Sequence, residues 1–245
     1  MLKPSHLFTL LCLLATGAGA APSEPGAANC HGPRSGIGRA TLPDSGTYVG
    51  RFANGLFDGQ GTLVWRDGDR YVGQFRRGLF HGYGAFSYHD GTSYKGHYLN
   101  GRENGHGVYR RPDDYTYSGD FKDGRFHGRG VTSYDDGRSY EGEFREGLWE
   151  GQGAYADPEQ FVYAGDFVAG KMHGQGRIVW ATGDWYEGEF RNNFPNGQGA
   201  CEIDGETGVC TYDKGQLVEQ LRPEDMQPDS SSDFTLLGTA PSGPA

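Results

Sequence analysis

Residues 71–91 read YVGQFRRGLFHGYGAFSYHDG, and this phrase recurs along most of the chain. Counting the opening tyrosine as position 0, glycine recurs at +2, +7, +11 and +13, and Phe or Tyr at +4. A fixed period in this range is typical of an array built from one supersecondary unit. Seven copies begin 23 residues apart, at Tyr48, Tyr71, Tyr94, Tyr117, Tyr140, Tyr163 and Tyr186.

Each copy contains two stretches in which aromatic residues or glycines alternate with polar or small ones, at 71–75 and 82–88. A period of two bounded by turn residues predicts two antiparallel strands per repeat. We expect a connection over residues 76–81 and a turn at Asp90-Gly91. With strands about 4.8 Å apart, seven repeats predict an elongated, all-β sheet on the order of 65 Å long, curved by its twist.

Glycine on the aromatic face suggests close packing. A glycine weakens a strand, yet it lets another group approach the backbone. Because Gly73 lies between Tyr71 and Phe75 on one face, we expect an aromatic ring from a neighbour to lie flat over it. Rings stacked in this way along the array would each add about 0.5–1.5 kcal/mol beyond the burial of their area.

The repeated pattern Tyr-x-Gly-x-Phe-x-x-Gly-x-x-x-Gly-x-Gly, with Asp-Gly near +20, resembles the MORN (membrane occupation and recognition nexus) repeat. The resemblance covers about residues 48–207. It implies a curved, single-layer antiparallel β-meander, and a role in scaffolding, dimerisation or membrane-associated binding. Arrays of this family are often attached to a kinase or methyltransferase domain, and no stretch of this chain is long enough to be either.

The ends of the array depart from the pattern. Residues 36–47 match the second half of a repeat, and a degenerate first half follows the seventh, so we expect the array to cover 36–221. Pro112 and Pro158 stand at +18 in two repeats, which predicts altered turns rather than breaks. The Ala-, Pro- and Gly-rich segment 21–35 and the Asp- and Ser-rich tail 222–245 are predicted to be disordered.

Residues 1–20 have the pattern of a secretory signal peptide: Lys3, an apolar run over 7–15 and small residues over 18–20. The alternative is an uncleaved N-terminal anchor. We expect the mature chain to be exported, either to a periplasm or out of the cell. The full chain has a formal charge of −10, which becomes about −11 without Lys3, so it has no general attraction for nucleic acid or anionic lipid.

Three cysteines follow this segment: Cys30, Cys201 and Cys210. The last two flank the turn sequence 204–207. With Gly205-Glu206 as the two-residue loop, they would stand directly opposite one another. In an oxidising compartment this predicts a Cys201–Cys210 disulfide. Cys30 is then the odd cysteine, and its pairing stays open.

Histidines recur at +10, at His81, His127 and His173, which invites a metal site. Two repeats of advance separate them by roughly 19 Å, so they cannot share one ion. We interpret them as turn residues that hydrogen-bond the backbone. No sequence motif for nucleotide binding, a metalloprotease or a serine-hydrolase elbow is present, so we predict no cofactor, no metal and no enzyme activity.

Two surfaces are candidates for binding. The first is an apolar ridge at +8 and +9, in the expected connections; the alternative is that these residues fold back and cover the sheet edge or the aromatic face. The second is a patch of arginines for binding an anionic surface; the alternative is that these arginines are ordinary solvated residues. The ridge comprises Phe57, Phe80, Phe126, Trp149, Met172, Leu56, Leu79 and Leu148, and the patch comprises Arg66, Arg70, Arg76 and Arg77.

These observations favour a non-enzymatic, exported scaffold that binds a protein, a second copy of itself included. A second hypothesis is peripheral binding to a membrane or to a cell-envelope polymer through the arginines and aromatic residues. A third is a small hydrolase, because catalytic residues can assemble from distant parts of a chain. The sequence indicates no nucleic-acid partner.

Overall fold

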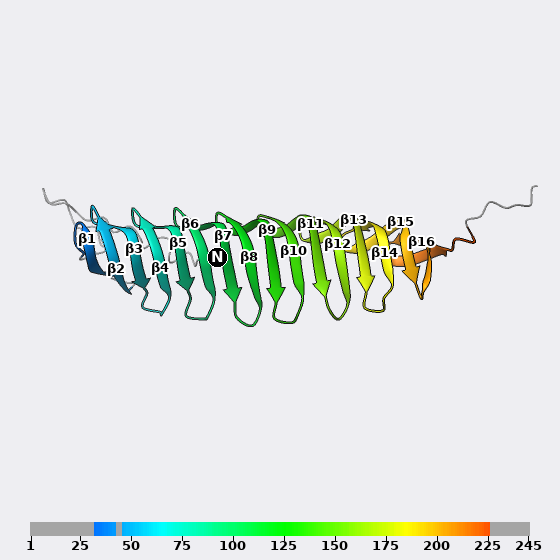
Figure 1. Ribbon diagram of the computed structural model, residues 1–245, viewed down its shortest axis with the longest axis horizontal. Helices are drawn as coiled ribbons and strands as arrows, with labels where there is room; N and C mark the ends of the chain where they lie inside the picture. The colour runs from blue at the N-terminus through cyan, green and yellow to red at the C-terminus, as the bar shows by residue number, and fades with distance from the viewer. Residues whose placement is uncertain (1–31, 43–45, 226–245) are drawn as a thin grey trace, which may run out of the picture.

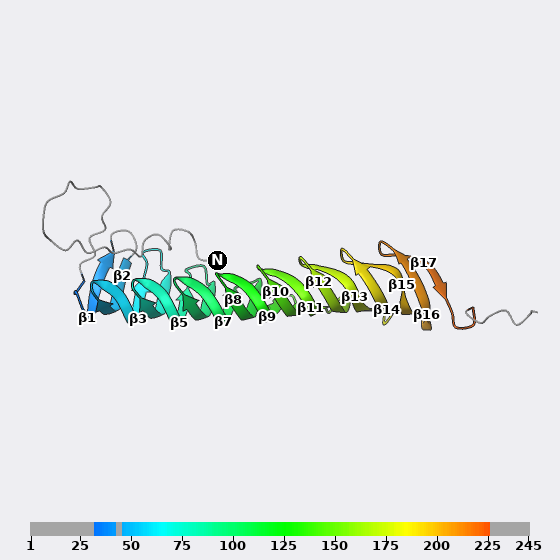
Figure 2. The ribbon, with the colours of Figure 1, turned by 90° about the horizontal axis from the view of Figure 1, so that it is seen from above.

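The computed structural model describes residues 32–42 and 46–225. The predicted signal peptide, Cys30, most of the lead-in and most of the tail lie outside these residues. The described chain forms seventeen strands, each hydrogen-bonded to the next along the sequence in antiparallel register. Figure 1 shows them side by side in one elongated row, and Figure 2 shows the same row from above. The fold is therefore the predicted all-β meander.

The strands are β1 Gly36–Leu42, β2 Gly46–Ala53, β3 Leu56–Val64, β4 Arg70–Arg76, β5 Leu79–Ser87, β6 Ser93–Leu99, β7 Arg102–Arg111, β8 Tyr115–Lys122, β9 Arg125–Tyr134, β10 Ser139–Arg145, β11 Leu148–Asp157, β12 Phe161–Val168, β13 Lys171–Trp180, β14 Trp185–Arg191, β15 Phe194–Ile203, β16 Glu206–Asp213 and β17 Gln216–Leu221.

Each repeat is a hairpin with a shorter connection than the sequence predicts. Only Arg77 and Gly78 separate β4 from β5, and both have positive φ, 51° and 83°. This is the geometry of a type I′ turn, which matches the twist of the paired strands. The expected connection over residues 76–81 is therefore wrong, because Leu79, Phe80 and His81 already belong to β5.

A bulge follows in the second strand of each of the seven repeats. In the second repeat, Gly73 pairs with Gly84 whereas Gln74 pairs with His81, so two residues of β5 are extra. Gly82, at +11, has a φ of 58°, a conformation that glycine adopts without the strain of a side chain. The +11 glycine thus shapes a bulge inside a strand.

The buried core consists of aromatic rings on one face of the sheet. The Tyr71 ring lies over glycines of its own repeat, since a Cβ added to Gly73 or Gly84 would come within 2.5 Å of the tyrosine oxygen. Its hydroxyl donates to the carbonyl of Gln74 at 2.9 Å. The ring over the glycine therefore comes from the same repeat, whereas the sequence suggested a neighbour. All seven opening tyrosines are buried.

The turns between repeats follow the sequence more closely. Gly68, Gly91, Gly137 and Gly183 of the Asp-Gly and Thr-Gly turns all have positive φ. Where Pro112 and Pro158 replace this chemistry, β7 still pairs with β8 and β11 with β12, so the prediction of altered turns without breaks is confirmed.

Cys201 and Cys210 form a disulfide with Cα atoms 5.8 Å apart, as predicted. The predicted register is wrong, however. Cys201 pairs with Gly208 and Cys210 with Gly199, so the cysteines are diagonal neighbours. The reason is the turn: Asp204 and Gly205 take the two positive-φ positions, which suit these residues better than Glu206.

Candidate functional site

The +9 side chains do not form an exposed ridge. Phe57, Phe80 and Met172 are 2%, 3% and 7% exposed, and Phe126 and Trp149 are partly buried against the same core. The three phenylalanines and the tryptophan stack on the opening tyrosine of their repeat, with ring centroids 3.7–4.3 Å apart. Because +9 lies in the strand, its side chain turns to the aromatic face. The ridge interpretation is wrong, and the alternative, cover of the aromatic face, is observed.

The leucines of the predicted ridge differ among themselves. Leu56 and Leu79 are half-buried, whereas Leu148 is 51% exposed. All three begin the second strand of their repeats, directly after the tight turn. They are separate residues at the ends of strands. The +9 rings that would have joined them into one apolar surface lie in the aromatic core instead.

The four arginines of the predicted patch are all exposed, but they lie in two places. Arg66 and Arg70 flank the turn before β4, and Arg76 and Arg77 lie at its other end. The six residue steps of strand from Arg70 to Arg76 span roughly 20 Å. The four side chains therefore do not make one anionic-surface patch.

The +10 histidines lie in strands rather than in turns. His81, His127 and His173 belong to β5, β9 and β13, one position before the bulge glycine. The Nδ1 atoms of His81 and His127 are buried and have no hydrogen-bond partner among the described residues. The predicted hydrogen bond to the backbone is therefore absent from these two nitrogens, and the three rings remain in separate repeats.

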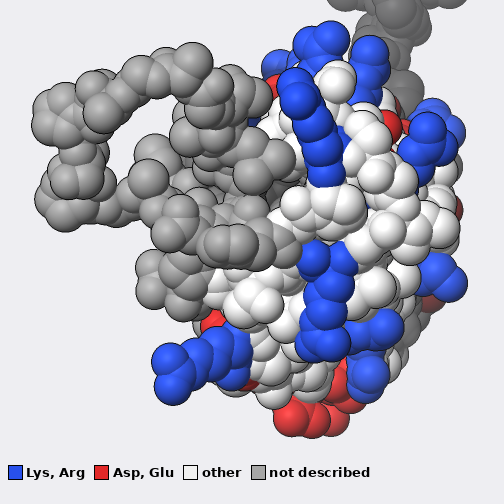
Figure 3. Space-filling view, turned by 90° about the vertical axis from the view of Figure 1, so that its left-hand side faces the viewer, with Lys and Arg blue, Asp and Glu red and all other residues white. Residues whose placement is uncertain are grey.

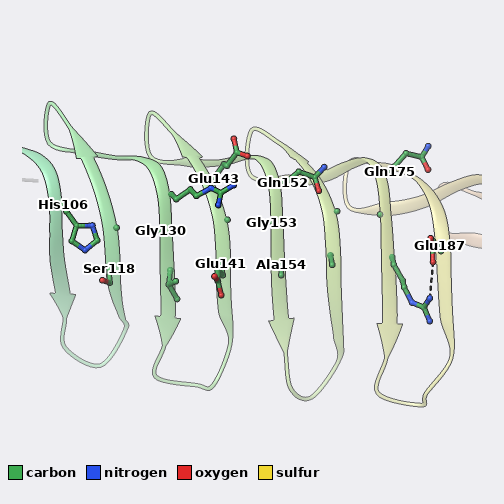
Figure 4. A pocket seen from close by; sticks show the side chains of 18 residues that line it. His106, Ser118, Gly130, Glu141, Glu143, Gln152, Gly153, Ala154, Gln175 and Glu187 are labelled. Atoms are coloured by element: carbon green, nitrogen blue, oxygen red, sulfur yellow. Dashed lines mark hydrogen bonds and ion pairs between the residues drawn. The ribbon is translucent and has the colours of Figure 1, made fainter.

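A shallow groove of about 930 Å³ crosses the face of the sheet opposite the aromatic core. It extends from β7 to β14, and its floor consists of small residues, among them Ala154, Ala164 and the glycines at +2 and +13. Figure 4 shows that its polar side chains come from successive strands and share one face. They stand at repeat positions +1, +3, +12 and +14, for which no function was predicted. The polar side chains are those of His106, Ser118, Arg129, Glu141, Glu143, Gln152, Gln175, Arg177 and Glu187.

Some polar groups of the groove pair across strands. Arg177 Nη1 lies 3.1 Å from Glu187 Oε2, and the guanidinium lies 4.1 Å from the ring centroid of Trp185. Glu141 and Glu143 have no ion-pair or hydrogen-bond partner for their carboxylates within the described part of the chain. The groove therefore offers two unpaired carboxylates on β10.

The two halves of the array differ in charge. Residues 46–114 contain nine Lys and Arg and seven Asp and Glu, a balance of +2, whereas residues 115–225 contain ten and twenty-one, a balance of −11. Figure 3 views the molecule from its β1 end, where Lys and Arg side chains are prominent. The groove lies mostly in the acidic half.

A Ser, a His and an Asp, the residue types of a hydrolytic triad, meet at the β7–β8 end of the groove. His106 Nδ1 is 3.5 Å from Asp120 Oδ1, and both side chains are more than half exposed. No hydrogen bond joins Ser118 to His106 among the described residues. A serine nucleophile needs such a contact with its base, so the geometry does not assemble a triad.

One group of possible metal ligands occurs in the described residues: Asp67, Asp69 and His89, in two neighbouring turns. The Asp69 Oδ1 accepts the backbone N–H of His89 at 2.8 Å and lies 2.7 Å from its Nδ1. Asp67 Oδ1 accepts the N–H of Asp69 at 3.2 Å. These bonds tie one turn to the next, which gives the cluster a structural role.

The repeat register, the tyrosine–glycine packing and the hairpins agree with a match to the family model described as "MORN repeat", at residues 48–70, 71–93, 94–114, 117–137, 140–159, 163–185 and 186–202. The chain belongs to the MORN repeat family. Its MORN array forms a β-sheet scaffold, and the groove lies within repeats three to seven.

Among solved structures, the MORN array is similar to the TCP domain of SAS-4 from Drosophila melanogaster, which was determined in complex with a proline-rich motif of Ana2. The identity is 12% and the TM-score 0.39, over 80% of this chain and 99% of that one. No relative is found among the curated proteins. In the described residues, no helix is long and apolar enough to cross a membrane.

Proposed function

We propose that this MORN array is a non-enzymatic scaffold that binds an extended, basic segment of a partner protein in the groove of its polar face. The groove between β7 and β14 carries the proposal, because it is a wide, accessible depression on a face whose side chains do not belong to the aromatic core. Its unpaired Glu141 and Glu143 lie in the half of the array with a balance of −11. Complementary charge favours a basic ligand.

The dimensions suit a polypeptide. Eight strands spaced about 4.8 Å apart make a groove roughly 34 Å long, which an extended chain of about ten residues would span. Gln175 adds an amide group that can bond to a peptide backbone, and Gln152, whose amide nitrogen donates to Asp166, offers its amide oxygen. Small residues such as Ala154 along the floor leave room for the backbone to approach the sheet.

We further propose that the array is exported. The signal-like pattern over residues 1–20 supports this, and so does the Cys201–Cys210 disulfide, because such bonds persist in oxidising compartments. N-terminal sequencing of the protein from its native host tests it. Cleavage after Ala20 is the expected result, and a mature chain that retains Lys3 in the cytoplasm contradicts it.

Fluorescence anisotropy with labelled ten-residue peptides tests the binding proposal. A peptide in which Lys or Arg alternates with Gly or Ser should bind, and its Glu-containing counterpart should not. Charge reversal in the double variant Glu141→Lys/Glu143→Lys should weaken binding on the order of tenfold or more. The double variant Asp213→Lys/Glu219→Lys, at exposed positions of β16 and β17 outside the groove, is the charge-matched control and should bind as the parent does.

Two results would contradict the proposal. One is equal binding of the basic and acidic peptides, which would remove charge complementarity. The other is an equal loss of affinity in Asp213→Lys/Glu219→Lys and in the groove variant, which would mean that only the net charge matters.

A further inference from the structure

The third repeat lacks the ring that covers the opening tyrosine in most other repeats. Position +9 holds Glu103 there, and its side chain is only 6% exposed. The Tyr94 ring meets Tyr98 and Phe121 edge-on, at 5.1 and 4.9 Å, and no described ring stacks on its face. Where other repeats place Phe or Trp, this repeat places a carboxylate among aromatic rings.

The Glu103 carboxylate has no partner in another described residue. Beyond the N–H of its own backbone, the described residues offer it no ion pair or hydrogen bond, although a buried carboxylate is costly unless it is paired. The Tyr98 hydroxyl beside it in the register is also buried, with no hydrogen-bond partner among the described residues, although it does not line the cavity next to Glu103. Such groups call for an explanation, and an external ligand is one.

A cavity of about 400 Å³ opens next to Glu103 on the aromatic side of the sheet. Three of its walls are the rings of Tyr109, Tyr115 and Phe126, whose centroids lie 5.9–6.3 Å from one another. Gly124 also lines it, and a Cβ added there would lie 3.2 Å from Glu103 Oε2. The carboxylate thus faces a space bounded by aromatic surfaces.

The two arginines at the cavity are already engaged. Arg111 Nη1 lies 3.4 Å from Asp114 Oδ2, and Arg125 Nη1 lies 2.5 Å from Glu146 Oε2. Each cation therefore has its own carboxylate. The negative charge of Glu103 is left without a described counter-ion.

We propose that this cavity binds an organic ammonium ion, with its methylated or alkylated nitrogen against Tyr109, Tyr115 and Phe126 and its charge balanced by Glu103. Ring faces attract such cations, and quaternary ammonium groups are recognised by aromatic cages of this kind. Hard metal ions prefer several oxygen ligands, and here the walls are mostly carbon. The volume falls within the usual range for small-molecule sites, and a choline-sized ion fits it.

The site lies on the aromatic face, in repeats three to five, whereas the peptide groove lies on the polar face. A failure of ammonium binding would therefore leave the peptide-binding proposal unaffected, and the reverse also holds. Choline itself and the phosphocholine headgroup of a lipid present the same cation, so both serve as probes.

The test is a titration of the full chain followed by the amide signals of Gly124 and Gly147, two glycines that line the cavity. Choline or phosphocholine should shift both signals saturably, with a dissociation constant no weaker than about 10 mM. The neutral isostere 3,3-dimethyl-1-butanol should bind at least about tenfold more weakly, because it lacks the charge that a cation–π site recognises. Tighter binding of phosphocholine indicates a headgroup ligand, and tighter binding of choline indicates a free one.

Two variants separate recognition from folding. Glu103→Gln keeps the shape and should weaken choline binding on the order of tenfold. Glu103→Phe restores the ring found in other repeats, so it should fold at least as well as the parent and lose the shifts entirely. Glu219→Gln is the control and should bind as the parent does. The proposal is overturned if neither probe saturates, if the neutral alcohol binds equally well, or if Glu103→Phe still binds choline.

Discussion

The ring of Phe80 stacks on the ring of Tyr71, with 3.9 Å between their centroids and 18° between their planes. On its other side the tyrosine lies against backbone, since a Cβ added to Gly84 would be 2.3 Å from its oxygen and 2.6 Å from Cζ. The Tyr71 ring is thus enclosed on both faces. The recurring spacing of tyrosine, +9 ring and +13 glycine describes one packing unit.

Gly84→Ala should therefore destabilise the second repeat. The added methyl group has no space unless the Tyr71 ring moves, and Phe80 opposes that movement, so we expect a loss of about 1–3 kcal/mol in the free energy of unfolding. Chemical denaturation measures it. Ala85→Val is the control, because the next residue faces the polar side and valine occupies this column elsewhere, at Val108 and Val131. Equal stability of the two variants would refute the enclosed-ring account.

The buried tyrosines predict a loss of stability in alkali. Burial, with a smaller contribution from Asp58, raises the pKa of Tyr48 from 10.0 to about 12. The folded state thus holds the phenolic proton more tightly than the unfolded state does. Its contribution to stability is complete below pH 10 and is lost as the pH rises from 10 through about 12.

Chemical denaturation across that pH range tests this prediction, with tyrosinate absorbance as the second readout. Tyr48→Phe should cost about 1 kcal/mol at neutral pH, because its hydroxyl donates to the carbonyl of Arg51 at 2.8 Å. The same variant should lose less stability than the parent between pH 10 and 12. Parallel pH profiles for the two proteins would contradict it.

The strands and repeat register could be predicted because a 23-residue period repeats seven times, which removes the ambiguity of any single strand. The hairpin turns could not be predicted from their own residues. A type I′ turn is usually signalled by Asn-Gly or Asp-Gly, as at Asn54-Gly55, but Arg77, Glu146 and Ala169 occupy the same positive-φ position. The pairing of the strands imposes that conformation on residues whose own preferences oppose it.

The wrong positions of the predicted turns explain why the apolar ridge was wrongly predicted. The predicted six-residue connection placed Phe80 outside the sheet, in an exposed apolar ridge. The observed two-residue turn places Phe80 in β5, against Tyr71. The groove was not predicted because it depends on which columns share the polar face over eight strands. Glu103 was visible as an exception at +9, but its burial depends on the rings of the next repeat.

Glu103 should lower the stability of the free protein. Burial raises the pKa of its carboxyl above the ordinary 4.5, so the folded state favours the protonated form. That preference stabilises the fold at low pH and is lost as the pH rises through the folded pKa. Glu103→Gln should therefore be more stable than the parent by about 1–3 kcal/mol near pH 7, with the difference closing as the pH falls toward 4.5.

Glu103→Phe should gain stability at both ends of that range, because the new ring can stack on Tyr94 as Phe126 stacks on Tyr117. Thermal unfolding of the two variants and the parent at about pH 7 and about pH 4 provides the comparison. A parent that is more stable than Glu103→Gln at neutral pH would show that the carboxylate is already satisfied.

The Cys201–Cys210 disulfide should protect the C-terminal end of the sheet specifically. It closes a loop with a sequence separation of 9, for which the chain-entropy model gives about 2–3 kcal/mol. An array unfolds by local units, so removal of the bond should affect β15–β17 first. We expect Cys201→Ser/Cys210→Ser to increase amide hydrogen exchange in these strands and to leave β4–β9 unchanged, with the reduced parent behaving in the same way. Uniformly faster exchange along the whole array would instead mean that the seven repeats unfold as one cooperative unit.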